Sequence, residues 1–214
     1  MHASASIAQR TFQAPPALLA KSFTRPRPVT LHTAETEIYA QGDAPGTLYR
    51  IEFGAVKIYR LLADGRRQVV AFHIAGETFG FEGGKSRSFF AECIVSTGLT
   101  TVDIDGDGRY SARLMELALK EMVRAQEHLL VVGKQCAAEK LAVFLMDLAD
   151  RQGGLDFIDI PMTRTDIGDY LGMTIETVSR NLSKLRAEGV LRLQSSRSIE
   201  ILKPERLRRL AGTN

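Results

Sequence analysis

Residues 163–189, with the sequence TRTDIGDYLGMTIETVSRNLSKLRAEG, decide the fold of the carboxyl-terminal part of this chain. Thr163 and Asp166, three residues apart, form a capping pair that predicts the start of a short helix. Gly172 ends that helix, because glycine accepts the left-handed backbone of a helix end at little cost. Thr174 then caps a second helix, which continues to the glycine that closes the stretch. Two short helices around a tight turn containing glycine predict a helix-turn-helix.

The two helices are expected to share an apolar core. Its members recur at helical spacing and are Ile167, Leu171, Ile175, Val178, Leu182 and Leu185. Gly168 lies within the first helix, where the absence of a side chain lets the second helix cross closely.

The second helix has a polar face that this core does not need. Glu176, Ser179, Arg180 and Ser183 lie together on it, at i, i+3, i+4 and i+7. Arginine can bond guanine O6 and N7, a carboxylate can accept from cytosine N4, and serine can bond either kind of group. We therefore expect Glu176, Ser179 and Arg180 to contact DNA base edges from the major groove. The alternative is a solvated face with one Glu176–Arg180 ion pair.

A basic surface is predicted around this helix. Residues 190–194 and 198–202 form a hairpin pattern, a wing with Arg197 at its tip. From residue 161 onward ten Lys and Arg stand against six Asp and Glu, whereas the first 160 residues carry 18 basic and 19 acidic side chains. This excess favours a polyanionic partner. The residues expected to contact DNA phosphates are Arg164, Thr174, Thr177, Lys184 and Arg197.

The amino-terminal half has the pattern of β-structure. Residues 1–28 hold four prolines and predict an irregular arm, with one short helical turn around residues 18–23. From 29 to 108 short alternating segments are separated by turn residues, and Asp64-Gly65 is the clearest hairpin signal. Many short strands at regular spacing predict a closed or sandwiched antiparallel sheet.

A long helix is predicted over residues 109–134, and a second helix, over 135–151, follows a break near Gly133. Apolar and small residues recur along the long helix at alternating spacings of three and four. They are Met115, Ala118, Met122, Ala125, Leu129, Val132 and Cys136. Such a heptad pattern predicts the contact between two symmetry-related helices of a homodimer. The alternative is a helix packed only on its own domain.

Composition excludes several classes of protein. Hydrophobic residues make up 44% and charged residues 25%, which is typical of a globular chain. No apolar run approaches the ~20 residues of a membrane span, and the start of the chain has no apolar leader. Two cysteines favour a reducing cytoplasm. The four histidines have no metal-site spacing and there is no nucleophile–base pair, so neither a metal, a cofactor nor an enzyme is expected.

The sequence resembles the CRP/FNR family of bacterial transcription regulators over nearly its whole length. The shared motifs are Gln41-Gly42-Asp43, Gly54-Ala55-Val56-Lys57, Asp64-Gly65-Arg66-Arg67-Gln68, Gly76-Glu77-Thr78-Phe79-Gly80 and the Glu-x-x-Ser-Arg pattern of the second helix. The residues after Asp64-Gly65 are most similar to the FixK-type branch.

This resemblance implies an α+β fold. Its parts are a β-roll similar to cyclic-nucleotide-binding domains (29–108), a dimerisation helix (109–134) and a winged helix-turn-helix domain (135–214). It also implies a homodimeric activator that binds TTGAT-type inverted repeats and contacts RNA polymerase. The genes implied are those of oxygen-limited respiration or nitrogen fixation.

Two features of the chain depart from better-known branches of the family. Cys93 and Cys136 cannot supply the four thiolates that an iron–sulfur cluster usually needs. Arg87-Ser88 matches the pair that binds cyclic-nucleotide phosphate in CRP, but the preceding glycine motif is one residue longer. The resemblance to FixK-type regulators implies regulation without a small effector. The alternative is a regulator that needs a cyclic nucleotide in the β-roll to bind DNA.

Overall fold

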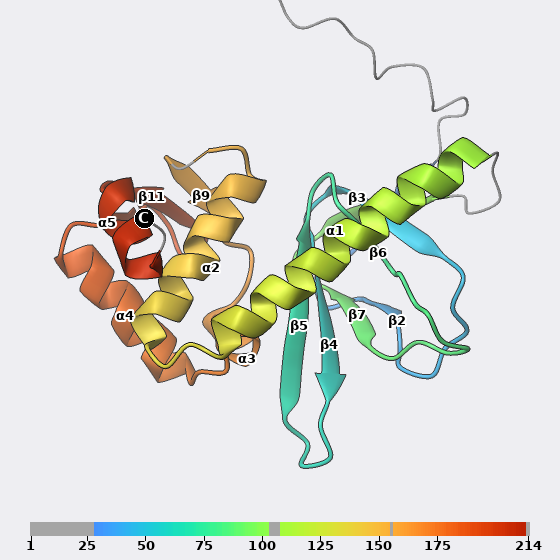
Figure 1. Ribbon diagram of the computed structural model, residues 1–214, viewed down its shortest axis with the longest axis horizontal. Coiled ribbons are helices and arrows are strands. Elements are labelled where there is room, and N and C mark those ends of the chain that lie inside the picture. The colour runs from blue at the N-terminus through green and yellow to red at the C-terminus, as the bar shows by residue number, and fades with distance from the viewer. Residues whose placement is uncertain (1–27, 103–107, 155, 213–214) are drawn as a thin grey trace, which may run out of the picture.

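The computed structural model describes residues 28–102, 108–154 and 156–212, except for the side chains of 108–111. A β-domain and a domain rich in helices lie side by side, and one long helix crosses the β-domain and ends next to the helix-rich domain (Figure 1). The expected arm lies outside the described residues, apart from Pro28, and so does the helical turn expected within it.

The β-domain consists of two four-stranded antiparallel sheets, in the strand orders β1-β8-β3-β6 and β2-β7-β4-β5. This arrangement confirms the predicted sandwiched antiparallel sheet. Its inner faces enclose a core that includes Ile51, Val56, Phe79 and Leu99. The strands are β1 (Thr30–His32), β2 (Glu37–Tyr39), β3 (Leu48–Phe53), β4 (Ala55–Leu61), β5 (Arg67–Ile74), β6 (Thr78–Phe79), β7 (Phe90–Cys93) and β8 (Thr97–Val102).

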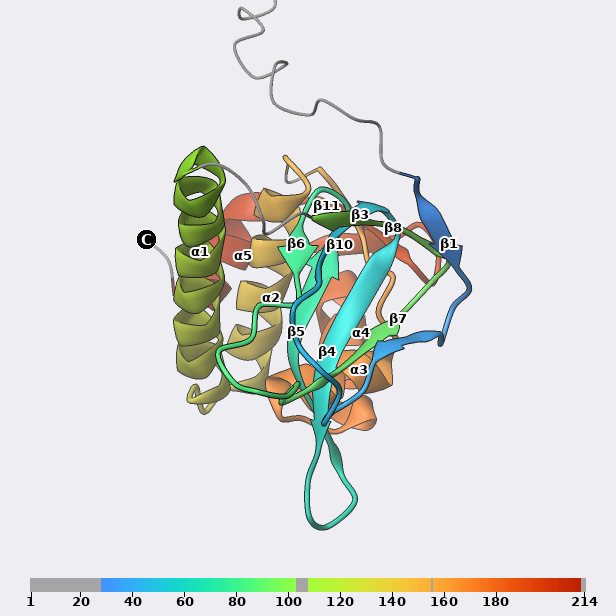
Figure 2. The ribbon, with the colours of Figure 1, turned by 90° about the vertical axis from the view of Figure 1, so that its right-hand side faces the viewer.

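The hairpin β4–β5 extends well beyond the rest of the β-domain (Figure 2). Its turn is the predicted one: Gly65 has a φ of 82°, and the Asp64 carboxylate accepts a hydrogen bond from the backbone N–H of Arg66 at 3.0 Å. Arg67, the first residue of β5, pairs with Leu61. The hairpin therefore places two adjacent arginines, Arg66 and Arg67, directly after its turn.

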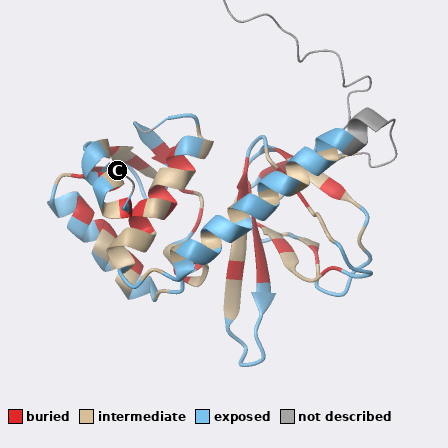
Figure 3. Ribbon diagram, viewed as in Figure 1, coloured by how far each residue is buried: buried red, intermediate tan, exposed pale blue. Residues whose placement is uncertain are grey.

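Helix α1 (Gly108–Val132) is followed by a four-residue linker and by α2 (Ala137–Arg151). Much of α1 is exposed (Figure 3), including Met115, Met122 and Leu129. One prediction about α1 is wrong. Cys136 was expected to continue its apolar pattern, but the helix ends before Gly133, and Cys136 is instead the N-cap of α2. Glycine at position 133 favours the end of α1.

The carboxyl-terminal domain contains the predicted helix-turn-helix and wing. Its elements after α2 are β9 (Phe157–Asp159), α3 (Arg164–Leu171), α4 (Ile175–Ala187), β10 (Leu191–Leu193), β11 (Ser198–Ile201) and α5 (Pro204–Ala211). The three strands form one sheet in the order β10-β11-β9. Leu141, Leu145 and Leu148 of α2 pack with the helix-turn-helix in one core.

The core between α3 and α4 differs from the expected set at one position. Ile167, Leu171, Val178, Leu182 and Leu185 are buried, as predicted. Ile175 is 43% exposed, because it is the first residue of α4 and lies at the turn and not beneath α3.

Gly168 has the packing role expected from the sequence. A Cβ atom at this position would lie 2.6 Å from the backbone carbonyl oxygen of Met173, which is far inside van der Waals contact. The missing side chain is therefore what brings α3 against the turn that precedes α4.

We expect Gly168→Ala to destabilise the protein by about 1–3 kcal/mol, because the backbone must move to admit the methyl group. The free energy of unfolding in urea measures this. Gly154→Ala is a suitable control, since a Cβ at Gly154 meets no atom within 4 Å. Equal stability of the two variants would contradict the packing argument.

Candidate nucleic-acid interface

Helices α3 and α4 both begin at the predicted caps. Thr163 Oγ1 accepts a hydrogen bond from the backbone N–H of Asp166 at 3.0 Å, and the Asp166 carboxylate accepts from the backbone N–H of Thr163 at 3.2 Å. Gly172 ends α3 with φ 65° and ψ 45°. Thr174 Oγ1 accepts from the backbone N–H of Thr177 at 3.3 Å and so caps α4. The first turns of both helices are thus fixed by local hydrogen bonds.

The three residues expected to contact bases lie on the outer side of α4. Glu176 and Arg180 are exposed and Ser179 is half-buried, whereas Val178 and Leu182 face the core. Arg180 Nη2 donates to Thr177 Oγ1 at 3.3 Å. These side chains are free to meet a partner without any loss of core packing.

The carboxyl of Glu176 remains ionised over the physiological range. Its pKa is lowered, first because its own backbone N–H donates to it and then because of a hydrogen bond with Thr174 and the positive charge of Arg180. An ionised carboxylate acts only as an acceptor, which suits the amino group of cytosine.

The five residues expected to contact phosphates come from three elements. Arg164 begins α3, Thr174 caps α4, Thr177 and Lys184 lie on α4, and Arg197 lies in the wing turn. Lys184 and Arg197 are exposed, while Arg164 and Thr177 are half-buried. Three of the five, Arg164, Lys184 and Arg197, are positively charged, and each comes from a different element, α3, α4 and the wing.

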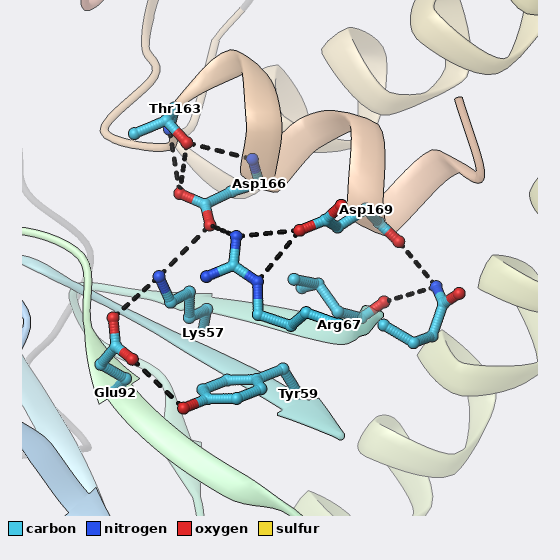
Figure 4. Close-up of polar contacts among 9 residues, drawn as sticks. Lys57, Tyr59, Arg67, Glu92, Thr163, Asp166 and Asp169 are labelled. Carbon is cyan, nitrogen blue, oxygen red and sulfur yellow. Dashed lines mark hydrogen bonds and ion pairs between the residues drawn. The ribbon is translucent and has the colours of Figure 1, made fainter. Parts of the chain in front are cut away.

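Four charged residues join the β4–β5 hairpin to α3, and we call them the clamp: Lys57, Arg67, Asp166 and Asp169 (Figure 4). Asp166 Oδ1 lies 3.2 Å from Lys57 Nζ and 2.7 Å from Arg67 Nη2. Arg67 also donates to Asp169 Oδ2 from Nε at 3.0 Å and from Nη2 at 2.9 Å. From the sequence, only the capping role of Asp166 could be predicted.

Neighbouring groups on the hairpin extend the clamp on both sides. Gln68 Nε2 donates to the backbone carbonyl of Asp169 at 2.7 Å. Lys57 Nζ lies 2.8 Å from Glu92 Oε1, whose other carboxylate oxygen accepts from Tyr59 at 3.3 Å. Each cation of the clamp is therefore held by more than one acceptor.

Asp166 is ionised in spite of its burial. Burial alone would raise the pKa of its carboxyl, but the hydrogen bond from Thr163 and the charges of Lys57 and Arg67 lower the pKa overall. The contribution of this group to stability is therefore present above the unfolded pKa and is lost as the pH falls through the lower folded pKa.

A second junction involves Glu77, which lies between β5 and β6. Its carboxylate lies 2.8 Å from Arg124 Nη2 on α1 and 2.8 Å from Arg151 Nη2 on α2. Arg151 also donates to the backbone carbonyl of Phe72 at 2.6 Å. The β-domain, the long helix and the carboxyl-terminal domain thus meet at one carboxylate.

Aromatic contacts complete the attachment of α3. The Tyr170 ring stacks on His128 of α1 with a centroid distance of 3.9 Å, and it lies 5.0 Å from Phe72 and 5.8 Å from Phe144. His128 Nε2 is 2.8 Å from the Tyr170 carbonyl oxygen. The side chains that hold α3 come from β5, α1 and α2.

The Arg87-Ser88 pair does not fit a nucleotide phosphate. The Arg87 side chain is buried, donates to the carbonyl oxygens of Gly80 and Thr47, and lies 4.2 Å above the ring of Tyr39. The backbone N–H and the hydroxyl of Ser88 both donate to the Glu82 carboxylate. Arg87 Nη1 and Nη2 and both donors of Ser88 are therefore already bonded within the protein, while Arg87 Nε is buried without a hydrogen-bond partner.

A winged helix-turn-helix whose recognition helix is exposed, joined by a long helix to a β-roll, defines a DNA-binding transcription regulator. The Crp-like helix-turn-helix family matches residues 139–210, and the cyclic nucleotide-binding domain family matches residues 31–107. The chain belongs to the CRP/FNR family, in its FixK-type branch.

Two FixK proteins and a solved structure illustrate the relationship. The chain is 53% identical to the nitrogen fixation regulation protein FixK of Rhizobium meliloti, over 87% of this chain and 89% of the relative. It is 37% identical to FixK of Azorhizobium caulinodans, over 82% and 75% of the two chains. FixK2 of Bradyrhizobium japonicum has a TM-score of 0.81 at 35% identity, covering 87% of this chain and 98% of that chain. Both curated relatives are named as regulation proteins, which agrees with the predicted class of this chain.

Within the described part of the chain, no helix combines the length and the apolar character required to cross a membrane.

Proposed function

We propose that the protein is a homodimeric transcription activator that binds a TTGAT-type inverted repeat in the cytoplasm and contacts RNA polymerase there. The observation that carries this proposal is the polar outer face of α4, held between two local caps and left uncovered by the β-domain. The names of the FixK relatives support a role at genes of nitrogen fixation. A role at genes of oxygen-limited respiration is proposed from the family resemblance alone.

Base and phosphate contacts are assigned to different residues. Glu176, Ser179 and Arg180 contact base edges in the major groove, and this gives sequence preference. Positively charged and hydroxyl groups hold the DNA backbone and give salt dependence without specificity. This second set is Arg164, Thr174, Thr177, Lys184 and Arg197.

Residues 109–134 serve as the dimerisation helix, between a β-roll at 29–108 and a DNA-binding domain at 135–214. Leu129 is 71% exposed in the single chain, and Met115 and Met122 are also exposed. A second copy of α1 would remove this apolar surface from water. The proposed interface comprises Met115, Ala118, Met122, Ala125, Leu129 and Val132 along α1. Cys136 is assigned to the same interface from the linker, beyond the end of that helix.

DNA binding needs no cyclic nucleotide, cofactor or metal in this proposal. The internal bonds of Arg87 and Ser88 support this view, since a phosphate would have to displace Glu82 and two carbonyl groups. The similarity to FixK also favours it over the effector-gated alternative.

Replacing Arg180 by Ala should cost roughly 1–3 kcal/mol per half-site and relax base choice at the contacted position. Gel-shift titrations at fixed salt, with wild-type and base-substituted repeats, measure both effects. Arg197→Ala is the comparison, because loss of a phosphate contact should weaken all sequences alike. Unchanged affinity and base preference for Arg180→Ala would refute the assignment.

Leu129→Glu should shift the protein towards monomers and abolish tight binding to the inverted repeat, because it places a charge in the proposed helix contact. Light scattering after size-exclusion chromatography gives the mass. Lys120→Gln is a matched control, since it changes the net charge equally at an exposed position of α1 outside the apolar pattern. A dimeric Leu129→Glu protein would place the interface elsewhere.

Cyclic AMP and cyclic GMP should leave the DNA affinity unchanged. Calorimetry with each nucleotide, beside a DNA titration without them, tests this. A saturable heat of binding together with tighter binding to the inverted repeat would instead establish the effector-gated alternative.

A further inference from the structure

We propose that Lys57 and Arg67 are positioning residues for DNA binding: through Asp166 and Asp169 they set the orientation of the recognition helix in the protein without a ligand. This inference rests on the proposed function, and it adds a role for the β4–β5 hairpin that lies outside the DNA-contacting residues.

Direct contacts link the β4–β5 hairpin to α3, and α3 to the turn before α4. Arg67 holds two carboxylates, one turn apart on α3, through contacts of 2.7–3.0 Å. Helix α3 in turn meets the turn before α4 at Gly168, where there is no room for a methyl group. A movement of α3 relative to the hairpin would therefore carry α4 with it.

The four side chains of the clamp are largely buried. The side chains of Lys57 and Asp166 are almost fully buried, and those of Arg67 and Asp169 are about three-quarters buried. Buried ion pairs contribute little net stability compared with apolar packing, but loss of one partner leaves an uncompensated charge. Such a network favours one relative placement of the two domains over all others.

The clamp contacts α3 on the side that faces the β4–β5 hairpin. Figure 4 shows Asp166 and Asp169 pointing from α3 towards the strands that carry Lys57 and Arg67. Glu176 and Arg180 on α4 remain exposed. The clamp thus fixes the helix-turn-helix without covering the surface that meets DNA, which is the property of a positioning contact and not of an inhibitory one.

In a dimer this orientation determines the distance between the two recognition helices. Two half-sites about one helical turn apart, ~34 Å, accept only a narrow range of helix placements. A protein that has lost the clamp should therefore bind the correctly spaced repeat less tightly and should discriminate less between spacings.

The test is a double-mutant cycle with Arg67→Met and Asp169→Asn, both of which keep the approximate shape of the side chain. Affinity is measured for the inverted repeat and for repeats whose spacer is lengthened or shortened by one and two base pairs. Each single variant should lose about tenfold in affinity for the correct spacing. The double variant should lose no more than either single one, and the preference among spacers should shrink in all three.

Two further variants separate positioning from folding. Arg66→Met is the matched control, because Arg66 lies on the same hairpin, is exposed, and pairs with Asp64 of the turn. It should bind like the wild type. Arg67→Lys keeps a cation and should retain most of the spacer preference. Mass and unfolding temperature, measured on every variant, should show folded dimers throughout.

Three outcomes would overturn the inference. Unchanged affinity and spacer preference for Arg67→Met would show that the clamp does not position α4, and tighter binding would show that it holds an inactive state. Equal losses for Arg66→Met would show a general effect of hairpin charge. These results leave the proposed function intact, whereas failure of the wild type to bind any inverted repeat would overturn both.

Discussion

The buried carboxylate of Asp166 connects local folding with domain arrangement. One of its oxygens accepts hydrogen bonds from Thr163 and so fixes the first turn of α3, while the other lies within 3.2 Å of Lys57 and Arg67 on the β-domain. The cost of burying this charge is offset because it has partners on both sides. The same group therefore determines where α3 begins and where α3 lies relative to the β-roll.

Other groups at the domain junction also have partners in more than one part of the chain. Glu77 bridges Arg124 of α1 and Arg151 of α2, and the Tyr170 ring packs among residues of α1, β5 and α2. The ion pairs require a particular relative orientation of the two domains, and the aromatic rings pack the space between them. Together they place the carboxyl-terminal domain with its recognition helix facing solvent. Much of α1 remains exposed (Figure 3), including its apolar residues Met115, Met122 and Leu129.

The helix-turn-helix could be predicted from sequence because its signals are local. Caps, a helix-ending glycine and a core with helical spacing all fall within 27 residues, and the structure places the caps as predicted. The prediction that Ile175 belongs to this core was wrong. Helical periodicity does not show that the first residue of α4 lies at the turn, outside the contact with α3. The clamp could not be predicted in this way. Arg67 and Asp166 are 99 positions apart, and no periodic pattern links residues at that separation.

The Arg87-Ser88 motif shows why residue type alone does not establish a ligand. The pair has the donors of a phosphate site, but here Glu82 and two carbonyl groups accept them, so the loop is held by the chain itself. A ligand that orders such a loop would have to be present before DNA is bound, whereas internal acceptors are present at all times. Binding to DNA then carries a smaller entropic cost, because the loop and the domain junctions are already ordered.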